Sequence, residues 1–280
     1  MKKEMNILVS LDQNYIPQLK VLLTSLYLNN PGVSFQIFLM HRKIPETVLQ
    51  RLSEDIHKLH WELHPVAVDE SLFRNAPVTK QYPQEMYYRL LAGQLLPEDL
   101  SRILYLDPDI LVINPLQDLW ETDIGQVLFA AAAHTGKTEL ANNVNRIRLG
   151  TNYDYYNSGV LLINLERCRN EIRPEDIFLF VREHAQELVL PDQDILNAMY
   201  STRILPLDDI LWNYDARNYH NYFVRSLGEA DMQWVMSHTS ILHFCGKDKP
   251  WKPNYRRRFG ILYLHYDQLM KRMFSLPRTM

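Results

Sequence analysis

The sequence predicts an α/β protein built on one mixed, mostly parallel sheet, and three observations carry this prediction. Short apolar runs alternate with amphipathic segments along the 280 residues, as in chains whose strands are joined by helical crossovers. Hydrophobic residues make up 46% and charged residues 22%, values typical of a chain with a large core. Glycine is scarce at nine residues and no flexible linker is visible, which favours one continuous domain.

The first part of the chain has a β-α-β-α-β order. Strands are expected at 6–11, 35–40 and 61–68, where apolar residues form short buried or alternating runs. A helix over 16–27 has its apolar residues at helical spacing and ends before Pro31-Gly32, and a second helix is expected over 45–60. A third helix is expected over 85–96, ended by Pro97.

The second part adds strands and then a basic end. Further strands are expected at 103–106, 127–133, 159–165 and 241–244, with helices at 174–188 and 192–200. Residues 247–280 contain nine Lys and Arg against two Asp, and apolar residues recur at helical spacing from Phe259 to Met270. We therefore expect a main α/β domain at 1–246 and a basic helical segment at 247–280.

Composition excludes several classes of protein. The net charge of −3 gives no indication of nucleic-acid binding, and two cysteines cannot form a disulfide scaffold. No apolar run approaches the roughly 18 residues of a membrane-spanning helix. The first apolar stretch stops at Asp12, which is too short for a signal peptide, so we expect a cytoplasmic protein. Oligomeric state is left open.

The sharpest local feature is Asp107-Pro108-Asp109, which follows an apolar strand. Ligands of open α/β sheets bind at the carboxyl ends of strands. Positions i and i+2 of an extended segment point the same way, and two carboxylates on one side repel each other unless a cation lies between them. Oxygen ligands suit Mg²⁺ or Mn²⁺, and Pro108 stiffens the segment. The alternative is a solvated turn.

A second cluster lies near the end of the last strand. His243 could be a third metal ligand, Gly246 permits close approach of a ligand, and Lys249 could supply charge to a phosphate. The alternative for His243 is a packed histidine. Cys245 has no partner motif that indicates thiolate chemistry.

Two polar segments complete the candidate residues. Asp192-Gln193-Asp194 stands at a helix start, where Asp192 could cap the helix or the free amides could bind an anion. Asn157-Ser158-Gly159 precedes a strand and suits a site wall or a plain turn.

Taken in order along the chain, these motifs resemble family-8 retaining glycosyltransferases, which include bacterial lipopolysaccharide galactosyl- and glucosyltransferases and glycogenin. Within the family, the sequence is most similar to general-stress-protein-A-like enzymes. The matching segments are Asp12-Gln13-Asn14-Tyr15, Tyr88-Arg89-Leu90, Asp107-Pro108-Asp109, Asn157-Ser158-Gly159, Asp192-Gln193-Asp194, His243-Phe244-Cys245-Gly246 and Lys249-Pro250-Trp251. They span nearly the whole chain. The segment His134-Thr135-Gly136 departs from the family, where an acidic residue is common.

The resemblance implies a GT-A nucleotide-sugar-binding fold, a UDP-sugar donor, and transfer of a hexose, glucose or galactose. It implies Mn²⁺ or Mg²⁺ on Asp107, Asp109 and His243, with Pro108 between the two carboxylates in the donor site. The remaining roles that it implies are nucleoside binding by Asp12, Asn14 and Tyr15, diphosphate binding by Gly246 and Lys249, and sugar binding by Arg89, Asn157, Asp192 and Gln193. Asp192 and Gln193 are also the candidate catalytic residues. Because Gln193 is a neutral amide, we favour front-face substitution over a covalent intermediate.

The acceptor expected is a glycan, a lipid-linked sugar or a glycoprotein, and the basic end suggests peripheral contact with the inner membrane face. Two other function classes compete. A haloacid-dehalogenase-like phosphohydrolase would carry Thr at the position of Leu111, and a catalytically silent sugar-binding protein would have a damaged metal site. No Gly-rich dinucleotide fingerprint follows the first strand, which disfavours a nicotinamide oxidoreductase.

Overall fold

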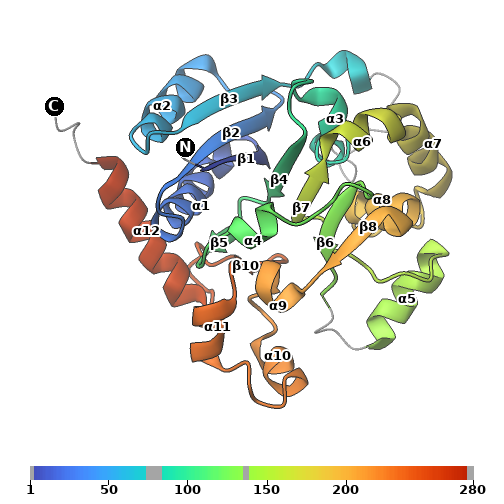
Figure 1. Cartoon of the computed structure of the whole chain (residues 1–280). Helices are drawn as coiled ribbons and strands as arrows, with labels where there is room; N and C mark the ends of the chain where they lie inside the picture. The colour runs from blue at the N-terminus through green and yellow to red at the C-terminus, as the bar shows by residue number, and fades with distance from the viewer. Residues whose placement is uncertain (1–2, 74–83, 135–138, 276–280) are drawn as a thin grey trace.

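The computed structural model describes residues 3–73, 84–134 and 139–275, and the statements below concern those residues. A seven-stranded sheet forms the centre, and a three-stranded sheet lies beside it (Figure 1). Helices cover both faces of the large sheet, which is the layered α/β arrangement expected from the sequence. None of the helices described here combines the length and apolar character needed to cross a bilayer.

The large sheet has the strand order β3-β2-β1-β4-β7-β6-β8. Its pairings are parallel except for the two that β7 makes, so the prediction of a mixed, mostly parallel sheet is confirmed. Its strands are β1 (Lys3–Ser10), β2 (Val33–His41), β3 (Glu62–Ala67), β4 (Arg102–Leu106), β6 (Phe129–Ala132), β7 (Val160–Asn164) and β8 (Ile204–Leu207). The small sheet has the order β5-β10-β9 and contains β5 (Ile110–Val112), β9 (Tyr214–Asp215) and β10 (Ile241–His243).

Twelve α-helices surround the sheets in the described part of the chain. They are α1 (Ile16–Asn29), α2 (Glu46–His57), α3 (Ala92–Leu95), α4 (Gln117–Trp120), α5 (Glu139–Leu149), α6 (Leu165–Glu171), α7 (Pro174–His184), α8 (Pro191–Tyr200), α9 (Asp209–Trp212), α10 (Tyr219–Arg225), α11 (Met232–His238) and α12 (Gly260–Ser275). Short 3₁₀ turns lie at Gln13–Tyr15, Glu70–Phe73, Gln84–Tyr87 and Ser201–Arg203.

Buried side chains alternate between the two faces of the large sheet. Ile7 and Leu104 belong to a core shared with α1 and α2, whereas Leu8 and Tyr105 belong to a core shared with α6, α7 and α8. This alternation follows from the two-residue period of a strand. Because both faces are covered, the central strands are apolar throughout, which is why the sequence displays them as continuous runs.

The single helix expected over 85–96 is wrong. The structure has a 3₁₀ turn at Gln84–Tyr87, then turns, and only the short helix α3. Tyr87, Tyr88, Leu90 and Leu91 are all fully buried or nearly so. The amide of Leu90 donates to the carbonyl of Tyr87, three residues earlier, at 3.1 Å, so tight turns form here in place of a continuous α-helix.

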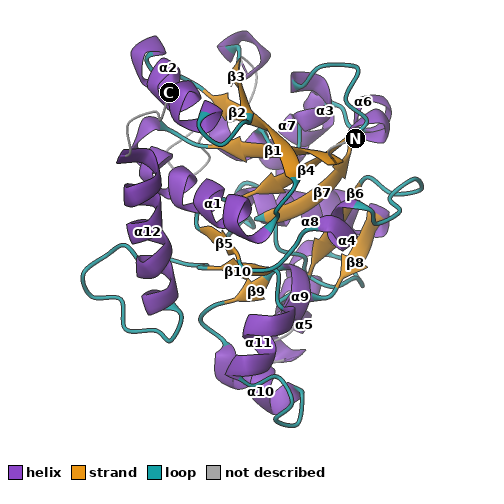
Figure 2. Ribbon diagram, turned by 60° about the vertical axis from the view of Figure 1, so that its left-hand side comes forward, coloured by secondary structure: helices purple, strands orange, loops and turns teal. Residues whose placement is uncertain are grey.

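Helix α12 packs against α1, so the last and the first helix of the described residues lie side by side (Figure 1, Figure 2). Its buried stripe, Tyr263, Tyr266 and Met270, joins a third core with residues of the small sheet. Asn29 in α1 donates a hydrogen bond to the hydroxyl of Tyr266 at 2.8 Å. The apolar stripe of the basic segment therefore faces the protein core, while Ile261 remains 79% exposed. The boundary at residue 246 stays a prediction.

Candidate active site

Strand pairing brings His243 next to the two carboxylates. Asp107 follows the end of β4 in the middle of the large sheet, and Asp109 precedes β5. In the small sheet, His243 of β10 pairs with Ile110 of β5, and the amide of Phe244 donates to the carbonyl of Asp109 at 3.0 Å. The turn between β4 and β5 thus delivers both carboxylates to the place where β10 ends.

The three side chains have the arrangement of a metal site. Nε2 of His243 lies 3.3 Å from a carboxylate oxygen of Asp109 and 3.9 Å from one of Asp107. One donor atom from each residue lies within 4.8 Å of the other two. Two carboxylates and an imidazole are ligands that Mn²⁺ and Mg²⁺ accept. The chemistry of this donor set fits the metal that the resemblance implies.

Gly159 keeps the space beside these side chains open. A Cβ at this position would lie 2.4 Å from Cε1 of His243 and 2.6 Å from a carboxylate oxygen of Asp107. Neither distance is compatible with van der Waals packing, so any larger residue would displace a ligand. The glycine identified from the Asn157-Ser158-Gly159 segment therefore has a packing role at the candidate metal site.

A chain of hydrogen bonds determines which nitrogen of His243 carries the proton. The amide N–H of Gly159 can only donate, and it donates to Oδ1 of Asn157 at 3.0 Å. Oδ1 of Asn157 also accepts from Nδ2 of Asn213 at 2.9 Å, which leaves Oδ1 of Asn213 facing Nδ1 of His243 at 2.9 Å. Nδ1 of His243 must then donate, so Nε2 is the nitrogen that faces the carboxylates and that carries the lone pair when the ring is neutral. Such an outer partner fixes the tautomer of a metal-binding histidine.

Lys249 is the cation closest to Asp109. Its ammonium group contacts the Asp109 carboxylate and donates to the carbonyl of Phe244 at 2.9 Å. Burial alone would raise the pKa of Asp109, but His243 and Lys249 outweigh burial and hold this pKa below its ordinary value. Asp109 is therefore a carboxylate at neutral pH, which is the form that binds a metal ion.

Arg89 joins the carboxylate after β4 to the one in α8. Its guanidinium lies 3.2 Å from Asp107 and 3.2 Å from Asp192, and it donates to the carbonyl of Ser158 at 3.0 Å. It also stacks on the ring of Tyr105 at 4.4 Å. Burial is the largest single influence and opposes the charged form, but Asp107, Tyr105 and Asp192 together outweigh it and raise the pKa of Arg89 further. Arg89 is thus a permanent positive charge at the site.

Asp192 and Gln193 point from the first turn of α8 toward this cluster. Asp192 accepts from the hydroxyl of Ser158 at 2.8 Å, and Gln193 accepts from Nδ2 of Asn157 at 3.1 Å. Asp192 makes no capping bond. The amides of Val189 and Leu190, before the helix, instead donate to the carboxylate of Asp194 at 2.6 and 2.9 Å. The helix-cap alternative for Asp192 is therefore wrong.

The predicted residues line one cavity of about 780 Å³, with the exception of Pro108 and the N-terminal group. The predicted residues that line it are Arg89, Asp107, Asp109, Asn157, Asp192, Gln193, His243, Gly246 and Lys249. Gly246 has a φ of +85°, which favours glycine, and a Cβ there would meet the guanidinium of Arg217 at 2.5 Å. The cavity volume lies within the usual range of about 300–1,000 Å³ for small-molecule sites.

Asp12, Asn14 and Tyr15 lie in the loop after β1 and do not line the cavity. A carboxylate oxygen of Asp12 accepts from the amide of Asn14 at 2.7 Å, which starts the 3₁₀ turn. The ring of Tyr15 meets Trp251 edge to face, with 6.4 Å between centroids. This contact joins the N-terminal loop to the segment that carries Lys249, although their side chains do not line the same cavity.

Comparison with known proteins identifies the family. Residues 6–254 match the profile described as glycosyl transferase family 8. The chain belongs to glycosyltransferase family 8. It is 29% identical over 275 residues to general stress protein A of Bacillus subtilis, with 95% of this chain and 94% of the relative covered. It is 25% identical over 265 residues to a lipopolysaccharide 1,2-glucosyltransferase of Escherichia coli, with 89% and 74% covered.

The fold comparison agrees with this family. The solved structure of the galactosyltransferase LgtC, in complex with donor and acceptor sugar analogues, matches with a TM-score of 0.78. The two chains are 22% identical, and the match covers 98% of each. This likeness confirms the GT-A fold that the sequence resemblance implies. The resemblance itself is confirmed by the family match, which extends past the predicted domain boundary to residue 254.

Sequence reasoning missed several residues that shape the cavity. Asn213 orients His243 but belongs to no motif and precedes a strand of only two residues. Arg148 pairs with the buried Asp194 at 2.7 Å, and Arg217 pairs with the buried Asp215 at 2.7 Å. Lone arginines give no sequence signal for a site. Of the segment that departs from the family, His134 lies at the cavity, whereas residues 135 and 136 lie outside the described residues.

Proposed function

We propose that this family-8 chain is a metal-dependent retaining glycosyltransferase that moves a hexose, glucose or galactose, from a UDP-sugar to an acceptor. The observation that carries the proposal is the convergence of Asp107, Asp109 and His243 at the wall of a large cavity. The names of relatives, among them lipopolysaccharide 1,2-glucosyltransferase and 1,3-galactosyltransferase, support a hexose donor and a cell-surface glycan, lipid or glycoprotein acceptor.

The diphosphate end of the donor would be held by charge. Asp107, Asp109 and His243 would hold Mn²⁺ or Mg²⁺ together with the diphosphate oxygens. When bound, the ion would neutralise negative charge that develops on the leaving UDP. Lys249 would supply a second positive charge, and Gly246 leaves its backbone accessible at the cavity wall. The loop with Asp12, Asn14 and Tyr15 would hold the nucleoside.

The sugar would lie against Arg89, Asn157, Asp192 and Gln193. Retention of configuration requires either a nucleophile on the far face of the sugar or attack from the face that the diphosphate leaves. Asp192 is engaged by Arg89 and Ser158, which reduces its nucleophilicity, and the amide of Gln193 is neutral. These contacts support front-face substitution: the C–O bond to UDP breaks, the acceptor oxygen bonds to the anomeric carbon, and the acceptor proton passes to the leaving phosphate.

The direct test is a panel of UDP-sugars incubated with the purified chain, with Mn²⁺, with Mg²⁺ and with a chelator. We expect UDP release from UDP-glucose or UDP-galactose only when metal is present. Gln193→Ala should lower this release but leave UDP affinity unchanged, since Gln193 faces the sugar. Metal-dependent UDP binding without any turnover across the panel and across glycan acceptors would favour the sugar-binding alternative.

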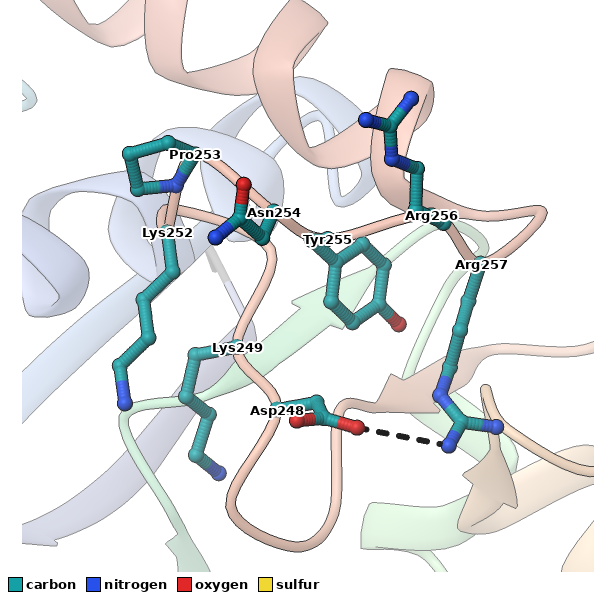
Figure 3. Close-up of a pocket in the computed structure, with 8 residues that line it drawn as sticks. All are labelled: Asp248, Lys249, Lys252, Pro253, Asn254, Tyr255, Arg256 and Arg257. Atoms are coloured by element: carbon teal, nitrogen blue, oxygen red, sulfur yellow. Dashed lines mark ion pairs between the residues drawn. The ribbon is translucent and has the colours of Figure 1, made fainter.

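We also propose that the protein is cytoplasmic and touches the inner membrane face through the loop before α12. Asp248, Lys249 and residues 252–257 line an open pocket of about 500 Å³ (Figure 3). In this view Arg257 reaches Asp248, at 3.5 Å, whereas Arg256 points away from both. Lys252, Arg256 and Arg257 are exposed. Each cation near an anionic leaflet contributes about 1 kcal/mol to binding.

Cosedimentation with vesicles that contain phosphatidylserine tests this membrane contact. Because α12 forms part of a core, the test should change charges in the loop instead of removing the helix. We expect binding at low salt that falls at high salt and falls in the variant with Lys252, Arg256 and Arg257 changed to Gln. The control is a second triple variant, Arg51→Gln, Arg182→Gln and Lys3→Gln, which removes the same number of positive charges outside the loop. If the loop variant binds vesicles as well as the wild type does, the proposal is contradicted.

A further inference from the structure

A second group of metal-binding side chains overlaps the first. One donor atom each from His134, His243 and Cys245 lies within 4.8 Å of the others. His134 follows β6, and Cys245 lies two residues after His243 at the end of β10. All three line the cavity described above. This group therefore shares His243 with the carboxylate site but offers nitrogen and sulfur in place of oxygen.

Hydrogen bonds determine which nitrogen of each imidazole can bind a metal ion. Nε2 of His134 lies 2.8 Å from the backbone carbonyl oxygen of Asn213, which can only accept. Nε2 of His134 therefore donates, and Nδ1 of the neutral ring carries its lone pair. The lone pair of the neutral His243 ring is on Nε2, because Nδ1 donates to the side chain of Asn213. A single residue, Asn213, thus orients both imidazoles through its backbone and its side chain.

We propose that His134, His243 and Cys245 form a soft-metal site that takes Zn²⁺ in competition with the carboxylate site. Thiolate and imidazole ligands favour Zn²⁺ over Mn²⁺ and Mg²⁺, which prefer oxygen. On binding, the thiol of Cys245 gives up its proton to solvent and bonds to the ion as a thiolate. Both sites need Nε2 of His243, and one lone pair cannot serve two ions. The two sites are therefore mutually exclusive.

Because the two sites compete, Zn²⁺ should inhibit the Mn²⁺-dependent activity. This consequence rests on the proposed function, whereas the binding of Zn²⁺ does not. A Zn²⁺ ion on His134, His243 and Cys245 withdraws His243 from Asp107 and Asp109. We expect low concentrations of Zn²⁺ to suppress Mn²⁺-dependent release of UDP, and added Mn²⁺ to relieve the suppression only in large excess. If no UDP-sugar is turned over under any condition, the proposed function fails, but the site itself remains testable by binding.

The binding test uses Co²⁺ as a spectroscopic substitute for Zn²⁺. A Co²⁺–thiolate bond gives a charge-transfer absorption that oxygen and nitrogen ligands do not give. We expect this absorption in the wild-type chain, its loss in Cys245→Ser, and its retention in Cys168→Ser. Cys168 is the matched control, since it is the other free and buried cysteine and packs in a different part of the molecule.

Zinc affinity, measured by competition with a chromophoric chelator, gives the second readout. We expect at least about a 10-fold loss in Cys245→Ser and in His134→Gln, relative to the wild type and Cys168→Ser. Thermal unfolding of each variant checks that the fold is retained. Electron paramagnetic resonance of bound Mn²⁺ tests exclusivity: Zn²⁺ should release Mn²⁺ from the wild type at a lower concentration than from Cys245→Ser. Absence of the thiolate absorption, or equal zinc affinity in all variants, would overturn the proposal.

Discussion

At the scale of single residues, Asn213 links the candidate sugar site to the candidate metal site. It donates to Asn157, which in turn donates to Gln193, and it accepts from His243. The sequence indicates Asp107, Asp109 and His243 because carboxylates and an imidazole at strand ends form recognisable motifs. It gives no indication of Asn213, because the role of this residue arises from the pairing of β9 with β10.

Replacing Asn213 tests this link. In Asn213→Ala, the ring of His243 loses the acceptor that fixes its tautomer, and we expect metal affinity to fall about 10- to 100-fold. Isothermal titration with Mn²⁺ measures the change. Asn218→Ala is the matched control, since Asn218 donates to Asp215 and does not touch His243. Equal Mn²⁺ affinity in both variants would contradict a role for Asn213 in positioning His243.

At the scale of elements, the site is made where β4 and β10 end and β7 begins. The apolar runs of β4 and β7 are visible in the sequence because both faces of these strands are buried. Strands of two or three residues, such as β5 and β9, are too short to display a period, so the small sheet was not expected. The sequence over 85–96 predicts a helix, but tight turns, such as the one closed by the bond from Leu90 to Tyr87, interrupt it.

Gly159, the residue before β7, tests how closely β7 approaches the side chains of His243 and Asp107. In Gly159→Ala the new methyl group meets His243 and Asp107, so we expect Mn²⁺ affinity to fall at least about 10-fold, with a stability loss of about 1–3 kcal/mol. Gly125→Ala is the control, because its methyl group approaches only the carboxylate of Asp123, at 3.2 Å. Binding and unfolding are measured on the same samples. Unchanged Mn²⁺ affinity in Gly159→Ala would contradict the packing argument.

An ion-pair cluster joins α1, α2 and α12 on the opposite side of the molecule from β8. Asp55 of α2 contacts Lys20 of α1 and lies 2.8 Å from Lys58, which donates to the carbonyl of Phe274 in α12 at 3.1 Å. Burial is the largest single influence and would raise the pKa of Asp55, but Lys20 and Lys58 together outweigh it and lower the pKa below 3.8. The carboxylate therefore stabilises the fold above this pH and ceases to do so as the pH falls through its lowered pKa.

Asp55→Asn tests the pH dependence. Since the cluster is partly exposed and screened by solvent, we expect a loss of only about 1 kcal/mol in the free energy of unfolding at pH 7. The difference between variant and wild type should stay constant down to about pH 5 and shrink below the ordinary Asp pKa of 3.8. Urea unfolding at a series of pH values measures it. A difference in unfolding free energy that grows as the pH falls would contradict this role of the Asp55 carboxylate.

At the scale of the whole molecule, three cores surround two sheets, and the third core attaches α12 to the small sheet that carries His243. The order of motifs along the chain was enough to predict the family and the fold. It was not enough to predict the overlap of two donor sets on one histidine, since His134 and Cys245 are distant in sequence. Such overlaps appear only when the strands are placed in space.

The central claim is that Asp107, Asp109 and His243 hold a divalent ion that in turn holds UDP. The most direct measurement is calorimetric titration of UDP into the wild-type chain and into Asp109→Asn, with Mn²⁺ and with a chelator. We predict that Mn²⁺ strengthens UDP binding to the wild type at least about 100-fold and has almost no effect on Asp109→Asn. Equal UDP affinity with and without Mn²⁺ in the wild type, or an undiminished effect of Mn²⁺ in Asp109→Asn, would contradict the claim.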